Sequence, residues 1–442
     1  MGRQKGSLGR LFVPIFLETL LYMLSGMIDT VMLSSVSDNT VAAVGTANTY
    51  IGIFIIMFSV VCTGAMAVMT QNIGAKRDGV AYQARQAGLV FNTVFGILLG
   101  VFLAVFSGPI LKVISISPAL FEDANRYLQI VGGFCVFNAI IPMFAGYLRA
   151  FGYTKHSLYA SLVGNGINLG LNAIFLFVLH WGVTGVAIAT VISKCINLLI
   201  VMIESKLLIH AKEDSHRISM KIVIKQIVMI GLPSAMETAI YNVAMTLVIR
   251  GLNRMPNSEF HVAARSYAAQ ITNFAYCAGA ALASANAILT GWRIGKGDYD
   301  ACDKGTKKAA LIGIVVAISM EGVIALNGAY IMKLFHSTPE MTKMVVTLLT
   351  IDIVLEVGRV SNLVFGNALK TSGDTIFPMV IGAIFMFLCA AGGTYFFGLH
   401  LGMCVVGAYI GLTLDEVIRA IAMFIRWQTG KWRKLSLVEK SR

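Results

Sequence analysis

Charged residues are scarce in this sequence. Asp, Glu, Lys and Arg make up 13% of it, whereas a typical soluble domain carries roughly 25%. Hydrophobic residues make up 57%, and the mean hydropathy is +0.77. A soluble protein of this composition would be hard to keep in solution. We therefore expect a multi-pass protein of the lipid bilayer, located in the cell membrane.

Motifs for metal binding, redox chemistry and proteolysis are also missing. The seven cysteines occur singly without CxxC spacing, and the seven histidines include no HExxH. These patterns indicate no metal site, no disulfide framework and no cofactor. The net charge of +13 comes from short Lys and Arg clusters between apolar runs, so we expect no nucleic-acid partner.

Twelve apolar segments are long enough to cross a hydrocarbon layer of about 30 Å. They lie at about 11–34, 41–70, 84–110, 121–147, 157–179, 183–205, 223–250, 260–290, 306–332, 341–368, 376–398 and 403–427. The sequence therefore predicts an all-α polytopic membrane protein with twelve transmembrane helices.

The twelve segments form two groups of six. We predict an N-terminal lobe at 1–205, a charged cytoplasmic connector at 206–222, a C-terminal lobe at 223–428 and a basic tail at 429–442. Lys and Arg gather in the loops on the same side as the connector and the two termini. Because positive loops stay in the cytoplasm, both termini are predicted to be cytoplasmic.

The two halves share motifs about 221 positions apart. IGAKRD at 73–78 corresponds to IGKGD at 294–298, and LRAFGYT at 148–154 corresponds to LKTSGDT at 369–375. Six spans are an even number, so both halves enter the membrane the same way up. We expect two lobes related by a pseudo-two-fold axis along the membrane normal, with substrate bound between them.

The first span carries acidic side chains in an otherwise apolar run. At helical spacing, Glu18, Tyr22, Ser25 and Asp29 share one side within about 60°. An acid in the middle of a span costs about 2.5 to 3.5 kcal/mol on insertion scales. This polar stripe should therefore face protein or a water-filled cavity.

The opening of the first span returns 219 positions later without its last acid, because Val248 replaces Asp29. The recurring residues are Pro14, Glu18 and Tyr22 in the first copy and Pro233, Glu237 and Tyr241 in the second. A residue needed by the architecture should recur, so we interpret the prolines and their glutamates as structural or gating. The asymmetry at Asp29 indicates ion coupling.

A family resemblance extends over nearly the whole chain. Its motifs are P(x3)E(x10)D followed by TVMLSSVSDNTVAAVG, LRAFGYTKHS, NGINLGLN with HWGVTGVAIAT, ALKTSGDTIFP and RWQTGKW. In this order they resemble the multidrug and toxic compound extrusion (MATE) transporters. The resemblance implies efflux of organic cations or other amphiphiles, driven by H⁺ or Na⁺, with lobes that rock between two states.

The sequence departs from two branches of that family. The family's first-span acid falls on Asp29. The DinF-like branch pairs this acid with N(x3)D on the fifth span, where this chain has Asn168 and Asn172. The NorM-like branch has an acid on the tenth span near Arg359, where the charge here is reversed. The chain therefore resembles a side branch, distinct from both patterns.

Asp29, Asn168 and Asn172 form the candidate ion-coupling site. Counted along their helices, Asp29 and Asn172 can lie at one depth. Asn172 could donate to the ionised carboxylate or coordinate Na⁺ through its carbonyl oxygen. The other interpretation is a hydrogen bond that holds two spans together. The functional interpretation is favoured because the second half lacks all three groups. Its equivalents are Val248, Cys389 and Gly393.

A second charged group lies on the tenth span, where Asp352, Glu356 and Arg359 share a helix face. Together with Glu237, Tyr22 and Tyr241 they could attract a cation into a substrate cavity, or they could form a network within the lobes. Both interpretations stay open. Asp415, Glu416 and Arg419 predict an ion pair within the last span, and Lys194, Arg265 and Glu321 are assigned no role.

These observations predict a secondary-active antiporter and not an enzyme. It would export amphiphilic, cationic small organic compounds by alternating access, as a monomer. The main alternative is a flippase for lipid-linked precursors, which should have a more basic cavity for pyrophosphate. A further alternative is a membrane enzyme or sensor that transports nothing.

Overall fold

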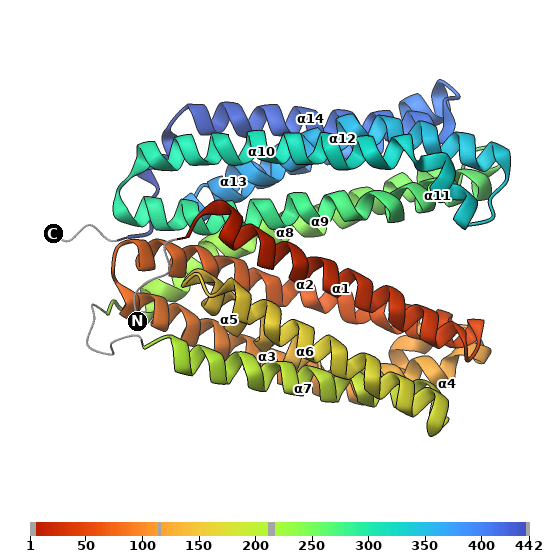
Figure 1. The fold of residues 1–442 in the computed structure, drawn as a ribbon, viewed down its shortest axis with the longest axis horizontal. Helices are drawn as coiled ribbons and strands as arrows, with labels where there is room; N and C mark the ends of the chain where they lie inside the picture. Colours follow the sequence, from red (N-terminus) through yellow and green to blue (C-terminus); the bar gives the residue numbers. More distant parts are fainter. Residues whose placement is uncertain (1–5, 114–115, 211–216, 439–442) are drawn as a thin grey trace. The chain divides into compact units, whose positions relative to one another are not determined.

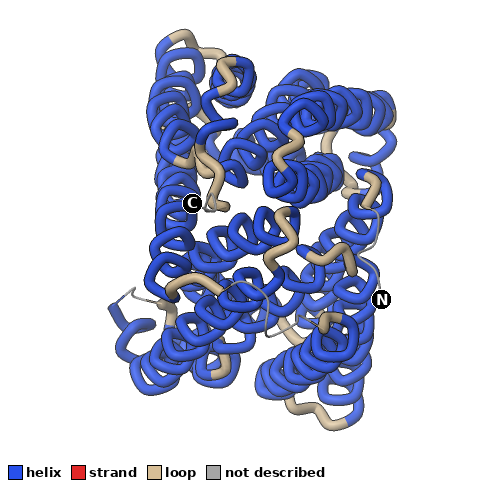
Figure 2. The backbone as a smooth tube through the Cα atoms, turned by 90° about the vertical axis from the view of Figure 1, so that its left-hand side faces the viewer, coloured by secondary structure: helices blue, strands red, loops and turns tan. Residues whose placement is uncertain are grey.

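The computed structural model describes residues 6–113, 116–210 and 217–438. Within these ranges the regular structure is helical throughout, with no strand, which confirms the predicted all-α class (Figure 2). Residues 1–5, the middle of the predicted connector at 211–216 and the end of the predicted tail at 439–442 lie outside the described residues.

The chain divides into two compact units, Met1–Gly231 and Leu232–Arg442. The first unit holds α1 (Leu8–Ser34), α2 (Asp38–Gly74), α3 (Asp78–Val113), α4 (Pro118–Tyr127), α5 (Val136–Ala150), α6 (Thr154–Ala173) and α7 (Gly182–Leu208) (Figure 1). The division falls inside α8 (Met220–Leu252). The second unit continues with α9 (Ser258–Lys296), α10 (Tyr299–Leu326), α11 (Gly328–Leu334), α12 (Pro339–Ser372), α13 (Ile376–Phe385) and α14 (Cys404–Gln428).

The predicted spans are present as helices. Nine helices of the described chain are long and apolar enough to cross a membrane, and the bent pair Pro118–Gly132 and Val136–Ala150 makes a tenth. The helices α12 and α14 are also long, but each carries charged side chains near its middle. With these two, all twelve predicted spans are accounted for.

Two spans are less regular than predicted. The segment predicted at 121–147 bends by 43° just after Gly132 and Gly133, where the chain leaves a short π-helical stretch, Leu128–Gly132. The segment predicted at 306–332 ends its long helix at Leu326, and the short α11 follows. Hydropathy alone does not register such breaks, because the residues at a break can be as apolar as the rest of the span.

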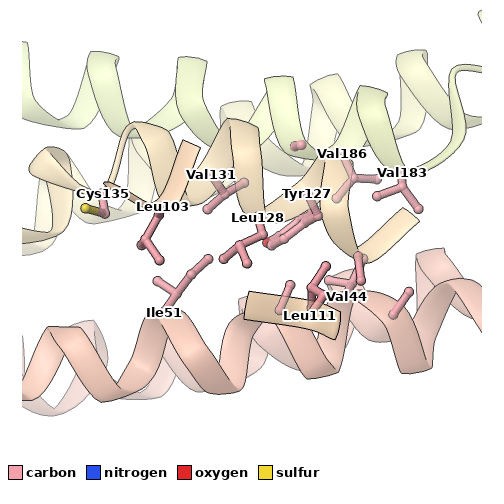
Figure 3. Packing of buried hydrophobic residues seen from close by; sticks show 14 of the residues in the cluster. Val44, Ile51, Leu103, Leu111, Tyr127, Leu128, Val131, Cys135, Val183 and Val186 are labelled. Atoms are coloured by element: carbon pink, nitrogen blue, oxygen red, sulfur yellow. The ribbon is translucent and has the colours of Figure 1, made fainter. Parts of the chain in front are cut away.

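The core of the first unit is formed by apolar side chains from α2, α3, α4 and α7. Ile51 of α2, Leu103 and Leu111 of α3 and Leu128 after α4 point toward one another (Figure 3). All four are at most 3% exposed. This packing fixes the scaffold on which α1 and α6 carry the polar residues of the first unit.

The duplication is visible in the backbone as well as in the motifs. Gly152 (φ 90°) and Gly373 (φ 102°) adopt the left-handed conformation at equivalent positions, 221 residues apart. Lys76 (φ 62°) and Gly297 (φ 76°) do the same in the IGAKRD and IGKGD motifs. The two halves therefore end these helices with the same backbone turn, although only three of the four residues are glycine.

In the second unit, a buried valine and a glycine at a close helix crossing occupy the positions equivalent to Asp29 and Asn172. Val248, the equivalent of Asp29, is 0% exposed within an apolar core. A Cβ on Gly393, the equivalent of Asn172, would lie 2.7 Å from the Cα of Gly411. The helices cross too closely there for an amide side chain, so the asymmetry seen in the sequence is also steric.

We predict that Gly393→Ala destabilises the protein by about 1 to 3 kcal/mol, because the added methyl overpacks this crossing. Thermal unfolding of the purified protein in detergent would measure the loss. Gly170→Ala on α6 is the matched control, since nothing lies within 4 Å of a Cβ at that position. It should be neutral or slightly stabilising. Equal effects of the two substitutions would contradict the close crossing.

Candidate functional site

The structure brings the three residues of the predicted ion site together in the first unit. The Asn172 side-chain amide on α6 donates from Nδ2 to Asp29 Oδ1 on α1 at 2.8 Å, and to Asn168 Oδ1 at 3.2 Å. Asn172 is 0% exposed and Asn168 is 6% exposed. The Asn172 carbonyl oxygen is buried with no hydrogen-bond partner among the described residues. The amide therefore presents its N–H groups to the carboxylate.

A lysine that the sequence left unassigned also has an amide partner within the first unit. Lys194 on α7 donates from Nζ to Asn138 Oδ1 on α5 at 2.8 Å. The first unit thus contains an acid and a lysine, each held by an amide on a neighbouring helix.

Glu18 and Glu237 form equivalent ion pairs in the two units. Glu18 Oε2 lies 3.5 Å from Arg149 Nη1, and Glu237 Oε2 lies 2.7 Å from Lys370 Nζ. Arg149 and Lys370 are the basic residues of the paired motifs LRAFGYT and LKTSGDT. In the first unit Glu18 also accepts a hydrogen bond from Ser157 at 2.9 Å. Each glutamate therefore links the first helix of its half to the fourth.

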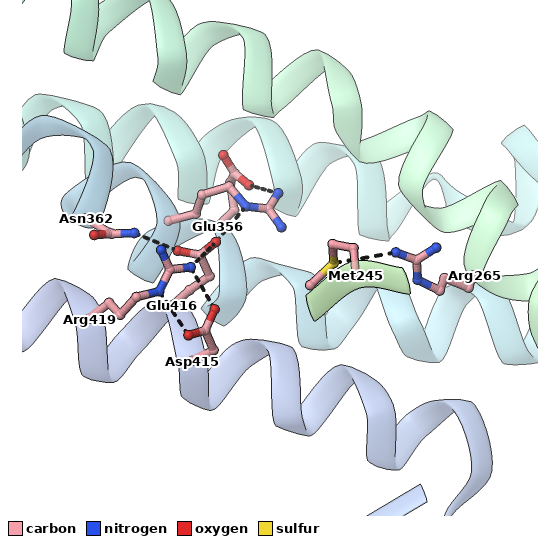
Figure 4. Close-up of polar contacts among 8 residues, drawn as sticks. Met245, Arg265, Glu356, Asn362, Asp415, Glu416 and Arg419 are labelled. Atoms are coloured by element: carbon pink, nitrogen blue, oxygen red, sulfur yellow. Dashed lines mark hydrogen bonds and ion pairs between the residues drawn. The ribbon is translucent and has the colours of Figure 1, made fainter. Parts of the chain in front are cut away.

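A charged network joins α12 to α14 in the second unit. Arg419 Nη2 lies 2.6 Å from Asp415 Oδ2 and 3.1 Å from Glu416 Oε1, which confirms the ion pair predicted within the last span. The network extends further, because Arg359 lies 3.5 Å from Glu416, and Asn362 donates to Glu416 at 3.0 Å (Figure 4). These contacts across two helices could not be read from spacing along one helix.

The charged groups predicted on α12, and Glu321 on α10, differ in their hydrogen-bond and ion-pair partners. Arg359 Nη1 bonds to Glu356 Oε2 at 2.8 Å, as expected for residues three apart. Asp352 is 2% exposed, and its Oδ2 has no hydrogen-bond partner in the described structure. Glu321 on α10 is 0% exposed, and neither of its carboxyl oxygens has a partner there.

The second unit contains a cavity of about 540 Å³. It is lined from α8, α9, α12 and α14, with Met386 just after α13. Its charged and aromatic lining residues are Glu237, Tyr241, Arg265, Tyr276, Asp352, Arg359, Lys370, Tyr409, Glu416 and Arg419. The cavity therefore combines apolar rings with charges of both signs, which suits an amphiphilic ligand.

The predicted substrate residues are distributed unevenly around this cavity. The residues that line it are Glu237, Tyr241, Asp352 and Arg359. Glu356 forms an ion pair with Arg359. Tyr22 belongs to the first unit, where its side chain is 77% exposed on α1. Pro14 and Pro233, each about one helical turn before Glu18 or Glu237, lie inside their helices.

Arg265 is one of the lining residues that sequence reasoning did not assign to the cavity, together with Tyr276, Lys370 and Tyr409. The other basic residues of α9, Arg293 and Lys296, lie in its last turn, and α9 carries no acid at a spacing of three or four residues from Arg265. No local signal distinguishes such a side chain from one that reaches toward the membrane surface. The cavity becomes visible only once α9 is packed against α8 and α12.

A model of the MatE family matches residues 14–174 and 233–396 of the chain. The "Uncharacterized transporter YisQ" of Bacillus subtilis (strain 168) is 30% identical over 432 residues, covering 96% of this chain and 94% of the relative. A "Probable multidrug resistance protein NorM" of Thermotoga maritima is 23% identical and covers 98% of this chain and 94% of the relative.

Among solved structures, MATE in the bent conformation superposes with a TM-score of 0.88 at 20% identity, over 99% of this chain and 98% of that chain. At 20% identity the structural similarity supports only the fold. The family model and the relative that is 30% identical show the family. The chain therefore belongs to the MatE family, the multidrug and toxic compound extrusion transporters.

Proposed function

We propose that this protein is a secondary-active antiporter of the cell membrane. It acts as a monomer with both termini in the cytoplasm, and it exports amphiphilic, cationic organic compounds in exchange for an inward-moving cation. Asp29 binds the coupling ion, and the cavity of the second unit contributes to binding the solute.

One observation carries this proposal. Asp29 is held by Asn172 at 2.8 Å in the first unit, whereas the second unit has a buried valine and a close glycine crossing at the equivalent positions. A contact needed only to hold the fold should recur in both halves, as the pairs of Glu18 and Glu237 do. A titratable group kept in one half suits energy coupling.

The coupling follows from unequal affinity for two states, since a ligand shifts an equilibrium only by its differential binding. Neutralising Asp29 removes a charge from the span and favours closure around it, and that closure expels the solute. A proton moving through about 100 mV and one pH unit supplies roughly 3.7 kcal/mol, which sustains a solute gradient of about 500-fold. One proton per cycle is sufficient.

The geometry supports H⁺ over Na⁺ as the coupling ion. The Asn172 amide turns its N–H toward Asp29, so its carbonyl oxygen is not a ligand beside the carboxylate. A proton avoids this difficulty, because it binds directly to one carboxylate oxygen and needs no second ligand.

We predict that a pH gradient, acidic outside relative to the dye-loaded side, drives counterflow of a cationic dye in proteoliposomes. An Na⁺ gradient imposed alone at equal pH should leave the dye distribution unchanged. Dye accumulation driven by Na⁺ alone would assign the coupling to Na⁺. Turnover of lipid head groups without dye movement would support the flippase alternative.

We predict that Asp29→Asn abolishes gradient-driven dye export in energised vesicles. The amide resembles the protonated acid in size and charge but cannot release a proton. Asp38→Asn, at the exposed start of α2, is the matched control and should export at the wild-type rate. Combining Asp29→Asn with Val248→Asp should not restore export. Wild-type rates in Asp29→Asn, with a normal unfolding temperature, would remove Asp29 from the mechanism.

We further propose that the network of Arg419, Asp415 and Glu416 is structural. The side chains of Arg419 and Asp415 are 4% and 2% exposed. An exposed pair of the same type, spacing and distance is present on α4, where Arg126 lies 2.6 Å from Glu122 and the side chains are 55% and 77% exposed. The two pairs share their spacing and N–O distance. They differ in burial and in the additional contact of Arg419 with Glu416, so comparing them tests the stability contributed by the buried network.

We predict that Arg419→Gln lowers the free energy of unfolding by about 3 to 5 kcal/mol, because it leaves buried carboxylates without their cation. Arg126→Gln should change it by less than about 1 kcal/mol. Denaturant titration of both variants in detergent measures the difference. A stable Arg419→Gln variant with weakened dye binding would instead make the network part of the substrate site.

A further inference from the structure

A contact between the fifth and sixth spans of the first unit contains a histidine. His156 Nδ1, in the first turn of α6, lies 3.2 Å from Glu204 Oε1, near the end of α7. The two side chains are 37% and 18% exposed, and Glu204 Oε2 is buried with no hydrogen-bond partner among the described residues. The ring of Tyr153, just before α6, meets the imidazole edge to face with the centroids 5.9 Å apart. The contact ties the start of α6 to the end of α7.

The second unit has a contact at the equivalent place, formed by different residues. Arg426 of α14 donates from Nε to Asp374 Oδ2 at 2.7 Å and from Nη2 to Asp374 Oδ1 at 3.3 Å. Its guanidinium also lies over the ring of Phe377 in α13, 4.8 Å from the ring centroid. Asp374 and Phe377 lie 221 positions after Tyr153 and His156, the offset of the paired motifs.

The last spans of the two halves align with an offset one residue longer. Gly182 (φ 54°) and Cys404 (φ 50°) both begin their helix in the left-handed conformation. Counted from these two residues, Glu204 corresponds to Arg426. Both units therefore join the fifth span to the sixth near the same end, and the first unit does so through an imidazole.

The two contacts respond differently to pH. A guanidinium and a carboxylate are both charged around neutral pH, so the contact of Arg426 with Asp374 is permanent there. An imidazole changes its charge between about pH 5 and pH 8. His156 therefore attracts Glu204 strongly in acid, when the ring is protonated, and weakly in alkali, when the ring is neutral.

The charged groups around His156 leave Glu204 as its acidic partner. In the first unit α6 packs against α1, α5 and α7. Glu18 of α1 is itself paired with Arg149 of α5 at 3.5 Å, and Glu204 is the acid within ion-pair distance of His156 in the described structure. The charged side chains of these four helices at this end of the unit are Arg10, Glu18, Arg149, Lys155, Glu204 and Lys206.

The helix held by this contact also carries the candidate ion site. Asn168 and Asn172 lie on α6, and Asn172 donates to Asp29 of α1 at 2.8 Å. Closure around a neutral Asp29 moves α1 and α6 relative to the rest of the unit. A contact that fixes the start of α6 against α7 opposes that movement.

We infer that His156 and Glu204 form a lock between α6 and α7 that engages when the cytoplasm is acidic. An antiporter that admits a proton with each cycle acidifies the cytoplasm, and the engaged lock slows further exchange. This effect on exchange rests on the proposed function. The lock itself rests on the His156 contact and on the permanent contact that replaces it in the second unit.

Hydrogen exchange of backbone amides tests the lock without any ion gradient. The purified full-length protein in detergent is compared at about pH 6 and pH 8, with correction for the chemical exchange rate. We expect about threefold greater protection at the lower pH in peptides from the start of α6 and the end of α7, the effect of one partly exposed ion pair. Peptides from the start of α13 and the end of α14 are the internal control and should be equally protected at both.

Substitutions at His156 distinguish a titrating contact from a merely structural one. His156→Gln and Glu204→Gln should each show the lower protection at both pH values. His156→Arg carries a permanent charge and should show the higher protection at both. The matched control is His210→Gln, at an exposed histidine just after α7, which should keep the wild-type pH dependence.

Two results would overturn the lock. The first is equal protection of the wild type at the two pH values. The second is a pH dependence that survives in His156→Gln or in Glu204→Gln. Loss of protection in His156→Arg as well as in His156→Gln would make the contact structural, with no role for the charge of the ring.

Dye export tests the effect on exchange. In inverted vesicles the pH difference across the membrane is held constant while the pH on the cytoplasmic side is raised from about 6 to about 8. The wild-type export rate should rise about threefold more than that of His156→Gln. Equal profiles would remove the lock from the transport cycle. If the proposed function fails, the hydrogen-exchange results stand but no dye moves at any pH.

Discussion

Lipid offers no hydrogen-bond partner to a charged side chain, and this constraint accounts for most polar contacts described here. Asp29 is held by an amide from α6, and Arg419 is held by two acids of its own helix. Lys194, which has no acid within ion-pair distance in the described structure, is bound by the side-chain carbonyl of Asn138. Each of these three side chains therefore has a polar partner, either on a neighbouring helix or one turn away on its own helix.

The duplicated architecture separates contacts needed by both halves from contacts particular to one. The pairs of Glu18 with Arg149 and of Glu237 with Lys370 join equivalent helices in the two units. Their recurrence is what a structural role requires. The Asp29 contact does not recur, because the second unit closes the equivalent space with a glycine crossing.

A third contact recurs with its chemistry changed. Asn138 on α5 accepts from Lys194 on α7. Arg359, 221 positions after Asn138, contacts Glu416 on α14, the last helix of its half as α7 is of the first. In this contact the basic residue of the first unit is Lys194, on the sixth span of its half. The basic residue of the second unit is Arg359, on the fourth span of its half. Both halves therefore have a polar contact between their fourth and sixth spans, with the charges arranged differently.

Hydropathy and the internal repeat were enough to predict the all-α class and the twelve spans and to single out Asp29, because lipid imposes long apolar helices and makes each intramembrane charge conspicuous. The motifs also indicated the family that the comparisons then showed. The sequence could place Asp29 and Asn172 at one depth, since rise per residue is fixed within a helix. It could not show the bend after Gly132, the orientation of the Asn172 amide, the partner of Lys194 or the cavity around Arg265. Each of these depends on which helix faces which, and that is decided when side chains from distant parts of the chain pack together.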